Sequence, residues 1–291
     1  MALKIERLLG AGGIARVYAT SDSNIALKLL TKTDSIDHLQ ALKREFDCLQ
    51  SLHHPKIVTV YDWIHTDEHI GFQMEHLNGF NGKVFAERLQ RLPPSERHQK
   101  VVSIGVQLLE AINHIHQNGW IHRDIKPSNL IIQDNAQTAL IDFGTVLPQH
   151  HQPKVHGLIG TPRYASPEQI TQHALQPSSD IYSVGATLYY LLLHQPPFSS
   201  RDRSQFIYPS LIDPTVPKHL EDLIVQMMSF IPDERGQIAD IIHQLTLVQT
   251  TVIPLAGREE TLREVSATLR RVHNGEQIHL NINGTRGSGK T

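Results

Sequence analysis

The chain of 291 residues is poor in several features that mark particular classes of protein. It has one cysteine, Cys48, so no disulfide can form within it, which is typical of the reducing cytosol. No apolar run approaches the roughly 18 residues that a membrane span needs, and the first residues lack the pattern of a signal peptide. Lys plus Arg number 27 against 29 Asp plus Glu, which gives no basic surface for nucleic acid. We therefore expect a cytoplasmic globular protein without a nucleic-acid or membrane partner.

The first quarter of the chain has the pattern of short strands and one helix. Glycines and polar turns separate the apolar stretches 3–9, 17–20, 25–30, 57–64 and 70–77. Between them, Leu39, Leu42, Phe46 and Leu49 recur at spacings of 3 and 4, which predicts a helix over 34–52.

The rest of the chain has mainly helical periodicity. An apolar stripe at 104–115 predicts a helix that ends near Asn118 and Gly119, and further helices are predicted at 180–193, 220–229 and 238–248. A small hairpin is predicted at 130–132 and 139–141. The stretch 144–169 has four prolines and little periodicity, which is typical of a long loop that is either functional or disordered. A strand-rich front and a helix-rich back predict an α+β protein of two unequal lobes.

Four short motifs follow one another in order. They are LGAGGIARV at 9–17, IALK at 25–28, IHRDIKPSN at 121–129 and DFG at 142–144. Each is weak alone, but the ordered set over residues 5–248 resembles the eukaryotic-type protein kinases, especially the bacterial serine/threonine kinases. The resemblance implies a kinase domain over 1–250, with a β-rich N-lobe (1–74), a hinge (75–79) and a helical C-lobe (80–250). It also implies a protein substrate and the use of ATP and Mg²⁺.

The resemblance implies a role for each charged residue of these motifs. Phosphoryl transfer requires positioning and neutralisation of phosphate charge. Lys28 would hold the α- and β-phosphates, with Glu45 as its partner on the predicted helix. Asp142 and Asn129 would supply hard oxygen ligands to Mg²⁺.

The resemblance also implies the catalytic and supporting groups of the helical part. Asp124 would orient the substrate hydroxyl and accept its proton, and Lys126 would neutralise the transferred phosphoryl group. Thr161 would contact both residues within the substrate platform at 160–168. Two further roles are structural: an ion pair of Glu168 with Arg235, and backbone hydrogen bonds to Asp180.

The expected nucleotide site combines a glycine-rich turn with an apolar sandwich. Backbone N–H groups near the phosphates would come from Gly10, Ala11 and Gly12. Met74 would lie behind the adenine, whose edge would meet the Glu75 carbonyl and the Leu77 amide. The ring would lie among Leu9, Val17, Ala26, Leu130 and Ile141.

Two departures from the kinase pattern leave its charges intact. Ala15 replaces the third glycine of the turn, and Ser166 replaces an alanine, both small changes. Because all six groups that act on charge are present, we expect an active kinase. The alternative is a non-catalytic nucleotide-binding module that regulates a larger kinase–ATPase signalling protein, or an inert fragment.

The stretch between 144 and 160 has an unusual composition. Its only hydroxyl residue is Thr145, and its centre carries His150, His151 and His156. We therefore expect activation without phosphorylation of the loop's centre. A metal site at these histidines is an alternative, but a solvated loop is favoured because no cysteine or carboxylate lies nearby.

The last residues resemble the start of another module. The sequence GTRGSGKT at 284–291 matches the P-loop pattern after an alternating, strand-like stretch at 278–282. With the helical pattern before it, residues 251–291 resemble a linker and the truncated entry to a STAND-class or AAA-like ATPase. No NTPase activity is expected of this segment alone, and further C-terminal domains are expected to be missing.

Overall fold

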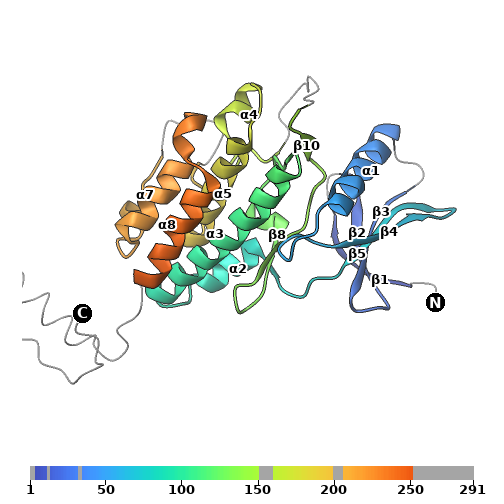
Figure 1. Cartoon of the computed structure of the whole chain (residues 1–291). Helices are drawn as coiled ribbons and strands as arrows, with labels where there is room; N and C mark the ends of the chain where they lie inside the picture. Colours follow the sequence, from blue (N-terminus) through green and yellow to red (C-terminus); the bar gives the residue numbers. More distant parts are fainter. Residues whose placement is uncertain (1–3, 12–13, 32–34, 151–159, 199–205, 252–291) are drawn as a thin grey trace, which may run out of the picture. The chain divides into compact units, whose positions relative to one another are not determined.

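The computed structural model describes residues 4–11, 14–31, 35–150, 160–198 and 206–251. These residues form a β-rich lobe and a helical lobe, so the expected α+β class is confirmed (Figure 1). The first lobe consists of strands β1 (Ile5–Ala11), β2 (Arg16–Thr20), β3 (Ile25–Thr31), β4 (Val60–His65) and β5 (His69–Glu75) and helix α1 (Ile36–Ser51).

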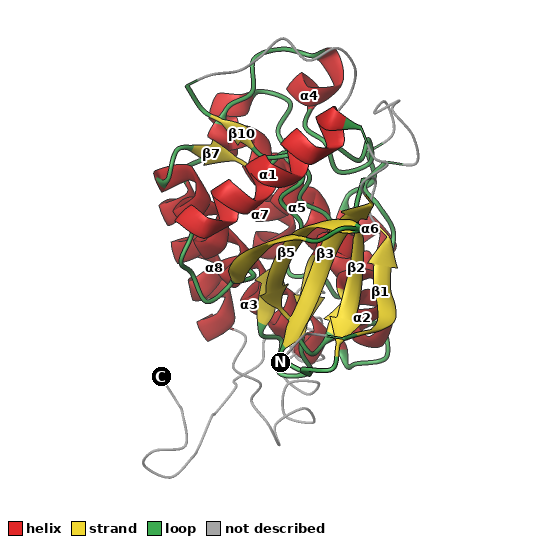
Figure 2. Cartoon of the chain, turned by 90° about the vertical axis from the view of Figure 1, so that its right-hand side faces the viewer, coloured by secondary structure: helices red, strands yellow, loops and turns green. Residues whose placement is uncertain are grey.

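The strands of the β-rich lobe form one antiparallel sheet with the order β1-β2-β3-β5-β4. Helix α1 packs beside it (Figure 2). Ser35 caps this helix by accepting a hydrogen bond from the His38 N–H at 3.2 Å. The helix buries Leu42, Phe46 and Leu49 of the predicted apolar stripe.

The helical lobe contains both the long helices and several short elements. Its helices are α2 (Gly82–Leu89), α3 (Pro94–Gln117), α4 (Pro167–Thr171), α5 (Pro177–Leu193), α6 (Pro209–Ile212), α7 (Lys218–Met227) and α8 (Ile238–Thr251), with 3₁₀ turns η1 (Pro127–Asn129) and η2 (Pro232–Arg235). Its strands are β6 (Phe80–Asn81), β7 (Trp120–Ile121), β8 (Leu130–Ile132), β9 (Thr138–Leu140) and β10 (Leu147–Pro148). None of the helices in the described ranges combines the length and apolar character needed to cross a bilayer.

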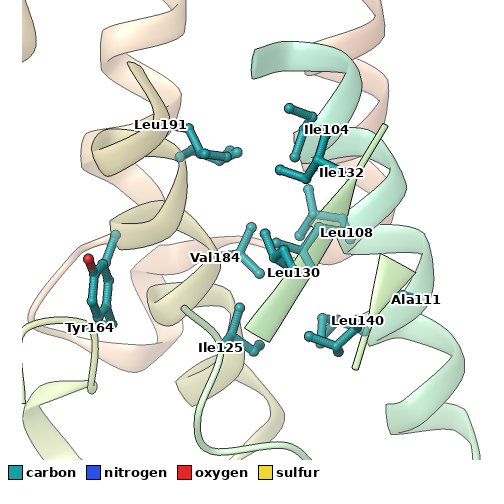
Figure 3. Packing of buried hydrophobic residues seen from close by; sticks show 14 of the residues in the cluster. Ile104, Leu108, Ala111, Ile125, Leu130, Ile132, Leu140, Tyr164, Val184 and Leu191 are labelled. Atoms are coloured by element: carbon teal, nitrogen blue, oxygen red, sulfur yellow. The ribbon is translucent and has the colours of Figure 1, made fainter. Parts of the chain in front are cut away.

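The core of the helical lobe lies between α3, α5 and the hairpin of β8 and β9. Figure 3 shows Leu108 of α3 and Val184 of α5 beside Leu130, with Ile104 of α3 next to Ile132, and all of them are buried. A Cβ atom on Gly105 would lie 3.0 Å from Leu188 Cδ1, so the missing side chain allows α3 to approach α5 closely. Burial of each such aliphatic side chain contributes about 1.5–3 kcal/mol. This rigid platform carries the loops described below.

Several predicted boundaries are wrong, and their reasons are tertiary. The strand predicted from residue 57 begins at Val60, because Ile57 and Val58 pair instead with Leu140 of β9. The strand predicted up to 77 ends at Glu75. The short elements β10 and α4 lie at least partly in the stretch 144–169 predicted to be irregular, and β10 pairs with β7. No periodicity identifies strands of two residues such as β7 and β10.

Candidate active site

The predicted ion pair between Lys28 and Glu45 forms inside the β-rich lobe. Lys28 Nζ on β3 lies 2.6 Å from Glu45 Oε1 on α1 and 3.0 Å from Asp142 Oδ1. Glu45 Oε1 also accepts a hydrogen bond from the Phe143 N–H at 3.2 Å. One ammonium group therefore joins the strand, the helix and the segment after β9.

The surroundings of this ammonium group decide its charge. Burial alone lowers the pKa of Lys28, but the carboxylates of Glu45 and Asp142 outweigh that effect and raise it above its ordinary value. Burial opposes ionisation of Asp142 as well, yet the Lys28 charge lowers the pKa of Asp142 to about 2. Lys28 and Asp142 are therefore both charged at neutral pH.

A second polar cluster surrounds Asp124, between β7 and η1. Asp124 Oδ2 accepts hydrogen bonds from Lys126 Nζ at 2.6 Å and from Asn129 Nδ2 at 3.3 Å. Its Oδ1 accepts from the N–H and the Oγ1 hydroxyl of Thr161, both at 3.0 Å. Lys126 Nζ also donates to Thr161 Oγ1 at 2.9 Å, so the predicted contacts of Thr161 are confirmed.

Asp180, a buried residue near the start of α5, holds the loop that carries Asp124 in place. Its carboxylate accepts hydrogen bonds from the His122 N–H at 2.8 Å and the Arg123 N–H at 2.9 Å, as predicted. His116 Nε2 lies 2.8 Å from the same carboxylate. Burial would raise the pKa of Asp180, but these partners lower it. Arg123 has a φ of 71°, a strained conformation that these bonds hold in place.

The predicted pair of Glu168 and Arg235 is also present. The two guanidinium nitrogens of Arg235 lie 2.6 Å and 2.8 Å from the two carboxylate oxygens of Glu168. Ser179 Oγ donates to Glu168 Oε1 at 2.6 Å. Burial raises the pKa of Glu168, but these donors lower it to about 2. This bidentate contact ties α4 to η2 and α5 beneath the substrate platform.

Most of the residues predicted around adenine are part of, or pack against, the hydrophobic core that extends through both lobes. Ala26, Met74 and Leu130 are buried in it, and Val17, Leu77 and Ile141 pack against it. Ala26 and Met74 are direct partners across β3 and β5. Leu9 stands apart from this core, with 37% of its surface exposed, and Gly10 and Ala11 lie on the exposed strand β1.

Three polar atoms of the residues predicted to bind adenine or Mg²⁺ have no hydrogen bond within the described part of the chain. They are the Leu77 N–H, the Asn129 Oδ1 oxygen and the Asp142 Oδ2 oxygen. The Glu75 N–H, in contrast, donates to the Thr59 carbonyl at 2.8 Å. An amide donor and two hard oxygen atoms fit a purine edge and Mg²⁺ respectively.

Some of the predicted positions lie outside the described residues. Gly12, His151, His156 and the whole stretch 252–291 are among them, so the P-loop prediction and the division into domains stay predictions. His150 is described and exposed. The ranges that the structure describes hold no group of three or more His, Cys, Asp or Glu residues that could bind a metal ion.

Several supporting residues escaped the sequence analysis. Gln169 Nε2 donates to the Arg123 carbonyl at 2.7 Å, and Thr145 Oγ1 donates to the His122 carbonyl at 2.9 Å. Gln169 belongs to a capping box with Ser166, a pattern that the sequence contains at 166–169. The capping pattern identifies a helix start, but nothing local in sequence indicates the contact with Arg123. His116 likewise has no local signal for its contact with Asp180.

Comparisons with known proteins agree with this geometry. The profile of the protein kinase domain family matches residues 3–246. Calcium/calmodulin-dependent protein kinase type II alpha chain of Drosophila melanogaster is 32% identical over 277 residues, which cover 89% of this chain and 52% of that protein. Serine/threonine-protein kinase PrkC of Bacillus subtilis is 30% identical over 254 residues, or 81% of this chain and 39% of PrkC.

A shorter relative is covered almost completely. Aurora kinase C of Mus musculus is 31% identical over 258 residues, which are 82% of this chain and 89% of that protein. The chain spans about half or less of the length of the fly and Bacillus relatives.

Proposed function

Because the chain belongs to the protein kinase family, we propose that it is a cytosolic serine/threonine protein kinase that uses ATP and Mg²⁺. The observation that carries this proposal is the pair of polar clusters at Lys28 and Asp124. One joins a charged lysine to two carboxyl groups, and the other surrounds an aspartate with Lys126, Thr161 and Asn129. The name of the Bacillus relative, a serine/threonine-protein kinase, supports transfer to serine and threonine hydroxyls.

Each residue then has a stated part in the transfer. Lys28, positioned by Glu45, binds the α- and β-phosphates of ATP. Asn129 Oδ1 and Asp142 are the groups that would hold Mg²⁺, which supplies neutralisation of the phosphate oxygens when bound. Asp124 orients the substrate hydroxyl and accepts its proton, while Lys126 offsets charge on the transferred group. The apolar side chains of Ala26, Met74 and Leu130, the Leu77 amide and the backbone of residues 10–12 bind the nucleotide.

The experiment uses radiolabelled ATP, Mg²⁺ and a generic protein substrate. The wild-type chain is expected to transfer label, and Asp124→Asn is expected to lose transfer by roughly 1,000-fold or more while it still binds nucleotide. Arg91→Glu, an exposed charge change away from these residues, serves as the control and retains transfer. Nucleotide binding with no transfer by the wild-type chain would show a non-catalytic module instead.

We also propose that residues 251–291 begin a P-loop ATPase module of a longer signalling protein. The match at 284–291 supports this proposal. The coding sequence after Thr291 tests it, because a P-loop module requires further strands and a Mg²⁺-binding acid. A continuation without them would contradict it.

A further inference from the structure

We propose that the substrate-facing surface beside Asp124 selects serine or threonine residues flanked by acidic residues. This surface consists of Lys83 at the start of α2, Arg163 in the turn before α4, and Lys126 in the loop 122–129 that carries Asp124, here called the catalytic loop. The proposal rests on the proposed kinase function and names the chemical class of its substrates. The observations behind it are the contacts that hold α2 and the turn around Arg163 against the catalytic loop.

Lys83 is held next to the catalytic loop by its two predecessors. A Cβ atom on Gly82 would lie 2.4 Å from the Pro127 carbonyl oxygen, so only glycine allows this approach. Asn81 Nδ2 donates to the Ser128 carbonyl at 2.7 Å, and Asn81 Oδ1 accepts from the Lys83 N–H at 3.0 Å. The backbone of Lys83 is therefore fixed beside Ser128, two residues after Lys126.

The ammonium group of Lys83 is exposed and makes no ion pair within the described ranges. Glu87, one helical turn further along α2, is spaced to pair with it. However, Glu87 Oε1 lies 3.9 Å from His194 Nε2, on the side of α5. Lys83 is therefore available to a partner from outside the chain.

Arg163 is placed by residues on either side of it. Thr161 is bonded to Asp124 and Lys126, and the Tyr164 N–H donates to the Thr161 carbonyl at 2.9 Å. The Tyr164 ring is buried against Tyr190, with ring centroids 6.1 Å apart. Arg163 lies between these anchored residues, is exposed, and forms no ion pair with any residue that the structure describes.

Apart from Asp124, the catalytic loop offers no carboxylate to balance these cations. Asp124 is already hydrogen-bonded to Lys126. The residue between Pro127 and Asn129 is Ser128, which carries no charge. A peptide whose hydroxyl meets Asp124 therefore lies near exposed cations on two elements that contact this loop, Lys83 and Arg163, and near Lys126, which Asp124 shares. Acidic flanks complement this charge, whereas basic flanks are repelled.

The test compares three peptides that differ only in their flanks. Each has one serine, with Glu, Gln or Lys on both sides, and kcat/KM is measured with the full chain and Mg·ATP. The Glu peptide is expected to exceed the Gln peptide by about fivefold and the Lys peptide by about tenfold or more. Because these charges are exposed, about 0.5 M salt should remove most of the difference.

Charge reversal locates the preference. Lys83→Glu and Arg163→Glu should each reduce it, and the double variant should favour the Lys peptide. Arg91→Glu makes the same charge change just beyond the far end of α2, where Arg91 lines a surface cavity of about 420 Å³ with Phe85 and Lys100, and it should leave the preference unchanged. Melting temperatures confirm that the variants are folded.

Failure of this inference differs from failure of the proposed function. Equal rates with all three peptides, or the fastest rate with the Lys peptide, would overturn the acidic preference and leave the kinase function intact. An acidic preference that survives both charge reversals would overturn the assignment to Lys83 and Arg163. No Asp124-dependent transfer to any peptide or protein would overturn the proposed function itself.

Discussion

The chain contains two buried ionic clusters of opposite character. Around Arg235, five N–H donors meet five acceptors: both oxygens of Glu168 and three backbone carbonyls, those of Ser178, Ser229 and Phe230. Around Lys28, one ammonium group faces two carboxyl groups, and Glu45 Oε2 is buried without a hydrogen-bond partner in the described residues. The first cluster is closed, whereas the second has two carboxyl groups for one ammonium group, and burial raises the pKa of Glu45.

Exposure separates the clusters further. The Arg235 side chain is fully buried and that of Glu168 is 9% exposed, but the Asp142 side chain is 39% exposed. A buried ion pair whose donors and acceptors are all matched has no atom left to bind a ligand, so its contribution is structural. A cluster with an excess of acid and an open carboxylate can take up a further cation. Burial and pairing alone therefore do not distinguish a site from a structural bond, but unsatisfied charge does.

The largest expected effect is on transfer, at the open cluster. Lys28→Met removes the cation that binds the phosphates, and transfer should fall by roughly 100- to 1,000-fold. It also leaves Glu45 buried beside Asp142 without a counter-charge. The protein without bound nucleotide should therefore lose about 3–5 kcal/mol of unfolding free energy. Labelled-ATP transfer and denaturant unfolding measure the two effects.

The double variant Lys28→Met, Glu45→Gln separates these effects. It removes the orphaned charge together with the cation, so stability should largely return while transfer stays lost. Recovery of transfer along with stability would show that Lys28 acts only in folding, and would remove the contrast between the clusters.

The closed cluster should show the reverse pattern. Arg235→Ala leaves Glu168 buried without its guanidinium partner, and should cost about 3–5 kcal/mol of unfolding free energy. Below the unfolding transition, the folded fraction should retain kcat within a few-fold of wild type, because no atom of Arg235 touches the groups at Lys28 or Asp124. Titration of unfolding with urea, with kcat measured in parallel, tests this separation. A loss of kcat in fully folded protein would place Arg235 within the machinery of transfer.

The pH dependence of stability should also identify the closed cluster. The pKa of Glu168 is about 2 in the folded chain, below its ordinary value of 4.5, since Arg235 and Ser179 donate to its carboxylate. Its contribution to stability is therefore complete above pH 4.5 and is lost as the pH falls from about 4.5 towards 2. The difference corresponds to roughly 3 kcal/mol. Unfolding of the wild-type chain and of Glu168→Gln across this range measures it, and equal pH slopes in both proteins would contradict the assignment.

Sequence alone predicted the polar groups of the candidate active site better than the packing around them. Lys28, Asp124, Asn129 and Asp142 lie in short motifs, where function fixes residue types at fixed spacing. Glu45 followed from its place on a helix whose apolar stripe could be read directly. The predicted contacts of these residues could be named because the motif supplies the partner as well as the residue.

The remainder depended on contacts between distant segments. Gln169 reaches the Arg123 carbonyl across 46 residues, and His116 reaches Asp180 across 64. Ile57 and Val58 have the composition of a strand, but the hairpin strand β9 competes for them with the sheet. Periodicity indicates which face of a helix or strand is apolar. It gives no information about which distant residue a polar side chain will contact.

The smallest effect is expected where a pair is exposed. Lys43 Nζ lies 2.5 Å from Asp47 Oδ1 on α1, with side chains 50% and 52% exposed, and water competes for both charges. Asp47→Asn should change the unfolding free energy by less than about 0.5 kcal/mol and leave transfer unaltered. Urea unfolding at low and high salt measures this directly. A loss of unfolding free energy comparable with that of Arg235→Ala would mean that exposed and buried ionic contacts stabilise this chain equally. Burial would then not predict how much an ionic contact contributes.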